Sequence, residues 1–339
     1  MQPAIYGLSG ERLTPDERDF FRDACPAGYI LFRRNCADRE QLRALTDELR
    51  AIAGRDDLPI LIDQEGGRVA RLRPPLWPAF PPAGRFADLY QVAPISGIEA
   101  ARVNAQASAV LLRECGVNVN CQPVLDVRQP GAHDIVGDRA LGSEPMQVAA
   151  LGRAVLDGMR AAGVVGVVKH MPGHGRSHCD SHEELPIVSA SPEELEQDIQ
   201  PFRSLAWAPM GMAAHIVYTA WDAERCASLS AIVIGEVIRG RIGFEGLLMS
   251  DDIGMHALSG SFGERARGVL EAGCDVALHC SGVLEEMVAV ASGLGAMSEA
   301  SRTRLDRAMA TVADAPASAS YEQLAAKRDQ LLAYASETA

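Results

Sequence analysis

The chain has 339 residues, of which 47% are hydrophobic and 23% are charged, a composition typical of a globular protein with a full core. Its net charge of −13 argues against nucleic acid as a partner, because a phosphate backbone calls for a basic surface. No stretch approaches about 18 uncharged apolar residues, and the N-terminus has neither a basic nor an apolar signal region. We therefore expect a soluble, cytoplasmic protein with no membrane partner.

Short apolar runs alternate with longer amphipathic runs along most of the chain. Because Gly, Pro or polar residues bound the short runs, these are typical of buried parallel strands. The expected strands are 4–8, 28–32, 59–62, 117–121, 164–168, 210–216, 246–249 and 275–278. The expected helices between and after them are 15–24, 39–53, 97–115, 145–162, 192–207, 229–240, 260–272 and 283–293.

Eight successive strand–helix units predict an α/β protein with a single (β/α)8 TIM-type barrel. Two of the helices have clear start signals, with an N-cap, a first-turn proline and an acidic capping-box partner in order at 14–17 and 191–194. The alternative is a doubly wound open sheet, which would normally need fewer units. We place the catalytic barrel at 1–294.

The residues from 295 to 339 are predicted to form a C-terminal helical extension. Helical patterns at 297–312 and 322–335 are separated by a linker of small residues with little core potential. We expect this extension to pack on the outside of the barrel or to form a subunit contact, without a catalytic role.

Polar residues follow four of the predicted strands. They are Asp63 after the third strand, Lys169 and His170 after the fifth, His215 or its neighbours after the sixth, and residues 250–252 (SDD) after the seventh. A barrel carries its active site at the carboxyl ends of the strands, so these side chains are expected to meet at one rim.

Four of the eight histidines lie in the segment 169–182, which reads KHMPGHGRSHCDSH. The histidines recur every fourth residue, but Pro172, Gly173 and Gly175 oppose a helix, so the segment is expected to be a loop. From the residues alone, the loop could do acid/base or substrate-binding work, or it could hold a metal.

Three motifs together resemble glycoside hydrolase family 3. They are residues 63–69 (DQEGGRV), the segment from Lys169 to His182, and residues 250–252, and they occur in the family's order along the chain. The resemblance covers residues 4 to 293, and it is strongest to the single-domain bacterial β-N-acetylglucosaminidases (β-hexosaminidases) of peptidoglycan recycling.

The resemblance implies a retaining glycosidase in which Asp251 is the nucleophile and His182, paired with Asp180, is the acid/base. Retention normally uses two carboxyl groups about 5 to 5.5 Å apart, so a histidine in place of one carboxyl is a departure. Side chains alternate along a strand, so Asp251 and Asp252 are not both expected to point into the pocket while the strand persists. The family pattern favours Asp251.

The resemblance also implies how the substrate is bound. Five residues match family positions that contact the sugar: Asp63, Arg71, Arg139, Lys169 and His170. We expect Glu65 to serve the backbone amides of its loop and His174 to shape the turn. No metal and no cofactor are expected.

The implied reaction is release of terminal non-reducing N-acetylglucosamine from muropeptide fragments, in which it is linked to 1,6-anhydro-N-acetylmuramic acid with or without peptide. The partner is therefore a small sugar or muropeptide, and the protein is expected to be a monomer or weak homodimer. The alternatives are a metal-dependent hydrolase that uses the histidine loop, a glycoside phosphorylase, a Schiff-base lyase that uses Lys169, and a sugar-binding barrel without activity.

Overall fold

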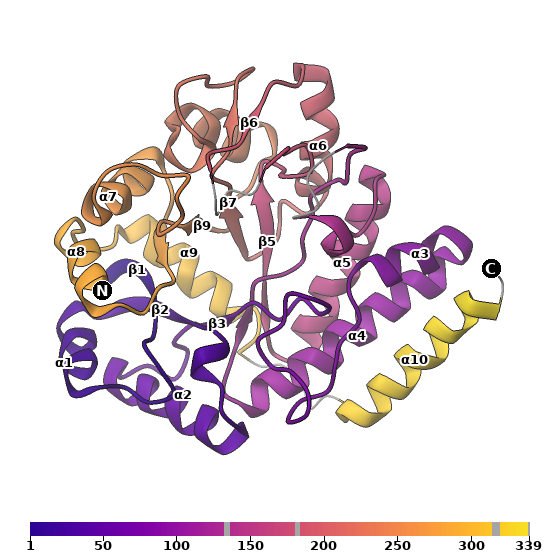
Figure 1. Cartoon of the computed structure of the whole chain (residues 1–339), viewed down its shortest axis with the longest axis horizontal. Helices are drawn as coiled ribbons and strands as arrows, with labels where there is room; N and C mark the ends of the chain where they lie inside the picture. Colours follow the sequence, from indigo (N-terminus) through magenta and orange to yellow (C-terminus); the bar gives the residue numbers. More distant parts are fainter. Residues whose placement is uncertain (132–135, 180–183, 314–318, 338–339) are drawn as a thin grey trace.

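Eight parallel strands close into one barrel, which confirms the predicted fold class (Figure 1). The computed structural model describes residues 1–131, 136–179, 184–313 and 319–337. Around the barrel the strands follow the order β1-β10-β9-β7-β5-β4-β3-β2. Their bounds are β1 (Gln2–Gly7), β2 (Pro26–Leu31), β3 (Ile60–Ile62), β4 (Val119–Asn120), β5 (Val165–Met171), β7 (Met210–Ala213), β9 (Leu247–Asp252) and β10 (Val276–His279).

Helices cover the outside of the barrel, and all but one of them lie close to the predicted ranges. They are α1 (Pro15–Ala24), α2 (Arg39–Ala53), α3 (Gly84–Val92), α4 (Pro94–Glu114), α5 (Pro145–Ala161), α6 (Pro192–Ser204), the π-helix η4 (Val233–Arg241), α7 (Phe262–Ala272) and α8 (Leu284–Ser292). Both predicted capping boxes form, at Thr14 with Glu17 and at Ser191 with Glu194. None of the helices in the described ranges is long and apolar enough to cross a membrane.

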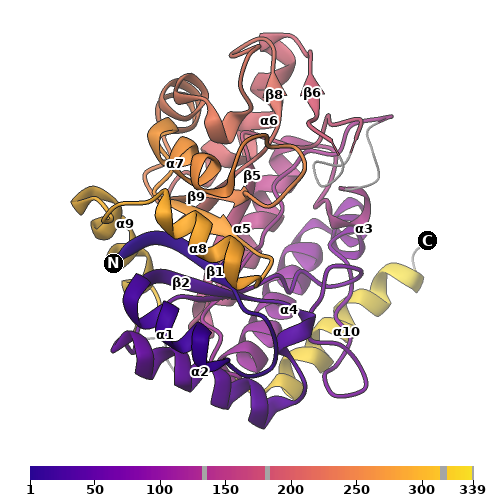
Figure 2. The same ribbon diagram turned by 60° about the vertical axis from the view of Figure 1, so that its left-hand side comes forward.

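Several short elements were not predicted. The strands β6 (Ile187–Val188) and β8 (Val217–Tyr218) pair in parallel outside the barrel, and Figure 2 shows them together at one end of the molecule. Three 3-10 turns are η1 (Arg33–Asn35), η2 (Gly137–Arg139) and η3 (Ala227–Leu229). The helix α3 was also missed, and it precedes α4 with a single residue between them.

The barrel interior is a packed apolar core that the C-terminal region helps to close. Side chains from the strands, such as Ile5, Leu61 and Val165, cluster with Leu305 and Met309 of α9 (Glu299–Ala310). This helix therefore contributes to the core as well as to the outer surface. The last helix, α10 (Tyr321–Glu337), lies along α4 (Figure 1).

Two strands continue beyond their predicted ends. The predicted fifth and seventh strands stopped before the first polar residues, but β5 includes Lys169 and His170, and β9 includes Asp251 and Asp252. The ladder continues there because Met171 pairs with Ala213, and Asp252 pairs with Leu278. The candidate site residues are therefore fixed by the sheet itself rather than carried on the loops that follow.

Candidate active site

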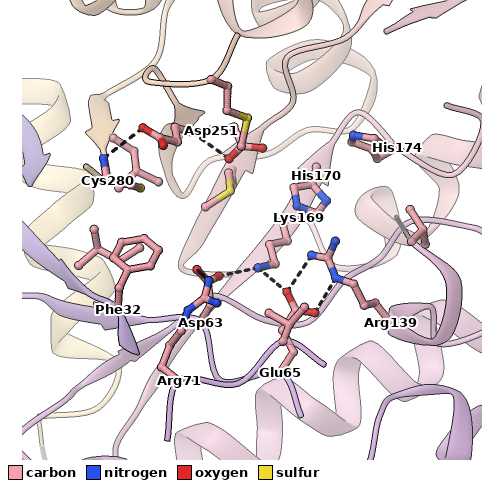
Figure 3. Close-up of a pocket in the computed structure, with 17 residues that line it drawn as sticks. Phe32, Asp63, Glu65, Arg71, Arg139, Lys169, His170, His174, Asp251 and Cys280 are labelled. Atoms are coloured by element: carbon pink, nitrogen blue, oxygen red, sulfur yellow. Dashed lines mark hydrogen bonds and ion pairs between the residues drawn. The ribbon is translucent and has the colours of Figure 1, made fainter. Parts of the chain in front are cut away.

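A cavity of about 270 Å³ lies at the carboxyl ends of the barrel strands (Figure 3). It is lined by Ile30, Phe32, Asp63, Glu65, Val69, Arg71, Val136, Arg139, Lys169, His170, His174, Met212, Asp251, Asp252, Met255, Leu278 and Cys280. Charged groups from β5, β9 and the segments after β3 and β4 meet here, as the sequence predicted for a barrel. The apolar side chains among them can pack against a sugar ring, and the charged ones can bind its hydroxyl groups.

Asp63 is held by two cations. Its Oδ1 accepts a hydrogen bond from Lys169 Nζ at 2.9 Å, and its Oδ2 accepts one from Arg71 Nη2 at 3.0 Å. Burial alone would raise the pKa of Asp63, but the charges of Lys169 and Arg71 hold it well below the usual range. Asp63 is therefore ionised at neutral pH, and it can accept hydrogen bonds from a hydroxyl group.

Glu65 forms the second acidic group of the same network. Its carboxylate accepts two hydrogen bonds from Arg139, at 2.8 and 2.9 Å, and Oε1 lies 2.7 Å from Lys169 Nζ. Burial opposes ionisation, but Lys169 and Arg139 lower the pKa of Glu65 to about 2. The expectation that Glu65 serves loop amides was wrong, because the side chain turns inward to Arg139 instead.

Lys169 stays protonated although it is almost fully buried. Burial favours its neutral form, yet the two carboxylates outweigh this effect and raise the pKa of Lys169. The network therefore places the three cations Lys169, Arg71 and Arg139 around Asp63 and Glu65 (Figure 3).

His170 and His174 are both hydrogen-bonded to Asp126, which was not among the predicted site residues. His170 Nδ1 lies 2.7 Å from Asp126 Oδ2, and the backbone amides of both histidines donate to Asp126 Oδ1. Asp126 is fully buried. It was missed because it lies five residues beyond the predicted end of the fourth strand, although it follows the same rule of an acid after an apolar run.

Asp251 lies across the pocket from the network of Asp63 and Glu65 (Figure 3). Its Oδ1 accepts a hydrogen bond from the backbone amide of Asp252 at 2.8 Å. Both aspartates line the pocket, although the Asp252 carboxylate is bound by backbone amides. The register between β9 and β10 shifts before Asp252, and this irregularity breaks the strict alternation of side chains.

The carboxylate of Asp252 is already engaged by the backbone. Its Oδ1 accepts from the amides of Gly254 at 2.9 Å and Cys280 at 3.1 Å. The buried His215 lies behind it, with Nε2 at 3.0 Å from the Asp252 carbonyl oxygen and Nδ1 at 2.6 Å from Ser228. Burial lowers the pKa of His215, so the neutral ring donates from Nε2 and holds the end of β9 in place.

Phe32 lines the pocket beside two arginines. The guanidinium groups of Arg34 and Arg71 lie 4.8 and 5.0 Å from the centre of the Phe32 ring. The charged Arg71 is thereby placed between the ring and Asp63, and these contacts restrict its orientation.

Six of the predicted site residues line this one pocket. They are Asp63, Arg71, Arg139, Lys169, His170 and Asp251. The predicted acid/base pair, Asp180 and His182, lies outside the described residues. The prediction that His174 shapes the loop agrees with the bond from its backbone amide to Asp126.

Residues 9–315 match the profile of the glycosyl hydrolase family 3 N terminal domain. Among curated proteins, the beta-hexosaminidase of Alkalilimnicola ehrlichii is 42% identical over 284 residues, which cover 82% of this chain and 80% of the relative. The beta-hexosaminidase of Methylococcus capsulatus is 39% identical over 282 residues, and 82% of each chain is covered.

Solved structures agree with the sequence matches. NagZ from Neisseria gonorrhoeae, in complex with N-trifluoroacetyl-D-glucosamine, superposes with a TM-score of 0.84 at 31% identity and covers 98% of this chain and 96% of that one. A family 3 β-N-acetylglucosaminidase from Paenibacillus gives a TM-score of 0.82 at 31% identity, and the match covers 97% of this chain and 66% of that one.

Proposed function

Because the chain belongs to glycoside hydrolase family 3 and is a β-N-acetylhexosaminidase, we propose that it releases terminal non-reducing N-acetylglucosamine from muropeptide fragments. The fragment is N-acetylglucosamine linked to 1,6-anhydro-N-acetylmuramic acid, with or without peptide, and the setting is cytoplasmic peptidoglycan recycling. The N-trifluoroacetyl-D-glucosamine bound by the gonococcal relative supports the choice of an N-acetylglucosamine-type ring.

One observation carries the proposal: Asp251 faces the network of Asp63, Lys169, Glu65 and Arg139 across a cavity of about 270 Å³ (Figure 3). A sugar ring between them would have its hydroxyl groups at the network and its anomeric carbon toward Asp251. In this arrangement, Asp63 and Arg71 bind the sugar hydroxyl groups from one side of the network. Lys169, His170 and Arg139 bind them from the other side.

The proposed reaction has two steps. In the first, the Asp251 carboxylate attacks the anomeric carbon while His182 donates a proton to the leaving oxygen, so a glycosyl-aspartate ester forms as the glycosidic bond breaks. In the second, His182 takes a proton from water, which displaces Asp251 and restores the original configuration.

A histidine suits the acid/base role at neutral pH. An unperturbed imidazole titrates near pH 6.5, so it can donate and then accept a proton without a buried carboxylic acid. We assign to Asp180 the orientation of the ring and the stabilisation of the imidazolium, as the carboxylate does in a Ser-His-Asp triad.

A fluorinated glycosyl donor, of the 2-deoxy-2-fluoro or 5-fluoro type, tests the nucleophile and the stereochemistry together. We expect the trapped sugar to map to Asp251 and not to its neighbour Asp252, and Asp251→Ala to abolish hydrolysis of a chromogenic β-N-acetylglucosaminide. NMR of the first-formed product should show retained configuration. A product that first appears inverted, or full activity in Asp251→Ala, would rule out the glycosyl-aspartate mechanism.

A further inference from the structure

The buried carboxylate of Asp126 binds two residues at the start of the histidine segment 169–182. Asp126 follows β4, where Val124 forms an isolated bridge with Lys169, and its side chain is inaccessible to solvent. Oδ1 accepts hydrogen bonds from the amides of His170 at 3.1 Å and His174 at 2.7 Å, and Oδ2 lies 2.7 Å from His170 Nδ1. Backbone and ring of His170 are thus fixed by one side chain.

The charge of Asp126 decides which nitrogen of His170 holds the proton. Burial would raise the pKa of Asp126, but His170, His174 and the hydrogen bonds lower it to about 2, so the group is a carboxylate at neutral pH. A carboxylate can only accept hydrogen bonds, so His170 Nδ1 must be the donor. In the neutral ring, Nε2 is then left as a hydrogen-bond acceptor.

The surroundings of His170 do not offer a competing carboxylate. Among the described residues, Asp126 is the one acid within ion-pair distance of its ring. The ring of His174 packs edge-on at 5.5 Å, and burial, the largest cause, lowers the pKa of His174 to about 4, so that this neighbour is neutral. The nearby cations Lys169 and Arg139 are committed to Asp63 and Glu65.

We propose that Asp126 is a positioning residue, which holds His170 in the Nδ1–H tautomer and so presents Nε2 to the pocket as an acceptor. Among the neighbouring groups, Lys169, Arg71 and Arg139 can only donate, and the acceptors Asp63 and Glu65 already bind these three cations. A sugar hydroxyl both donates and accepts, and an acceptor beside these donors satisfies both of its roles. The part that concerns the sugar rests on the proposed function, whereas the tautomer does not.

The variant Asp126→Asn tests the tautomer while it keeps the shape of the side chain. The amide oxygen can still accept from the two backbone amides, but the amide nitrogen now donates toward His170 Nδ1. The ring should therefore change to the Nε2–H tautomer.

Nitrogen-15 NMR of histidine-labelled protein distinguishes the two tautomers directly, with His170→Gln to assign the signals and a pH chosen by titration at which the ring is neutral. We expect Nδ1–H in the parent protein and Nε2–H in Asp126→Asn. An Nε2–H signal in the parent protein, or the same tautomer in both, would overturn the proposal.

Kinetics test the consequence for substrate binding. We expect Asp126→Asn to lower kcat/KM for a β-N-acetylglucosaminide by roughly 10- to 100-fold, because Nε2 of His170 then carries a proton and can no longer accept a hydrogen bond from the sugar hydroxyl. The double variant Asp126→Asn/His170→Gln should be no worse than His170→Gln alone, because Asp126 acts through His170. Additive losses would show instead that Asp126 has a general structural role.

A matched control is Asp275→Asn, which neutralises another buried, multiply hydrogen-bonded carboxylate far from the pocket. It should leave kcat/KM unchanged in folded protein. If the parent protein does not hydrolyse β-N-acetylglucosaminides, the proposed function fails, but the NMR comparison still decides the tautomer. If the tautomer changes as expected and activity does not, the positioning role in catalysis is wrong.

Discussion

At the scale of single residues, Lys169 is the link between the two buried carboxylates of the pocket. Its ammonium group lies 2.9 Å from Asp63 and 2.7 Å from Glu65. In the variant Lys169→Met each carboxylate keeps one arginine but loses the shared charge. We expect a loss of about 3–5 kcal/mol in the free energy of unfolding at pH 7, measured by urea denaturation, because the removal of one partner leaves buried charge uncompensated.

The stability deficit of Lys169→Met against the parent protein is also expected to depend on pH. In the parent protein, the pKa of Glu65 is lowered from 4.5 to about 2, so its contribution to stability is complete above pH 4.5 and is lost as the pH falls toward 2. Without Lys169, burial favours the protonated carboxyl of Glu65. The variant should therefore lose less free energy of unfolding than the parent protein as the pH falls. The deficit against the parent protein should therefore shrink from pH 7 to pH 4. A constant deficit, or an equal loss in the exposed-pair control Lys327→Met, would contradict this account.

His182→Ala is expected to separate substrates by their leaving groups. A poor leaving group needs a proton as the glycosidic bond breaks, whereas an activated phenol needs little, so the loss of kcat/KM should be much larger for the first. The measurement compares a muropeptide-type disaccharide with a nitrophenyl β-N-acetylglucosaminide. Equal losses on both would count against the role of His182 as general acid.

At the scale of elements, the sequence predicted all eight barrel strands but misplaced some of their ends. Buried parallel strands are continuous apolar runs, so all eight could be located. The ends were misplaced where polar residues face the pocket, as at Lys169 and Asp251, because a polar side chain there does not end the ladder. The irregular register before Asp252 also has no signal in the sequence.

Close packing between two loops gives a test at this scale. A Cβ on Gly175 would lie 1.9 Å from the carbonyl oxygen of Val127, so Gly175→Ala must push apart the loop after β5 and the segment after β4. We expect about a 10²-fold loss of activity, typical of a site displaced by about 1 Å. Gly10→Ala is the control, because nothing lies within 4 Å of a Cβ there. Unchanged activity in Gly175→Ala would show that the loop adapts.

At the scale of the whole molecule, most of the pocket residues could be predicted but their pairing could not. The rule that strand ends carry the site selected Asp63, Lys169 and Asp251, and these line one cavity. The partners of these residues depend on long-range contacts, such as Glu65 with Arg139 and Asp126 with His170, which no local pattern encodes. For this reason the sequence does not predict a binding role for Asp126 or Glu65.

At the end of the barrel opposite the pocket, a substitution is expected to change stability without changing activity. Asp275 is buried and accepts from Arg239 at 2.9 Å, from Arg304 of α9 at 2.7 Å, and from Ser301 at 2.8 Å. It ties α9 to the barrel, and its neighbour Val276 begins β10, whereas the pocket lies at the strands' other ends.

Asp275→Asn should therefore lower the free energy of unfolding by about 3–5 kcal/mol, because two arginines lose their partner, and leave kcat/KM unchanged below the unfolding transition. Asp306→Asn on the same helix breaks an exposed pair with Arg302 and should cost less than about 1 kcal/mol. Urea denaturation and kinetics on the same samples distinguish the outcomes. A loss of activity in folded Asp275→Asn would mean that α9 influences the pocket through the barrel core.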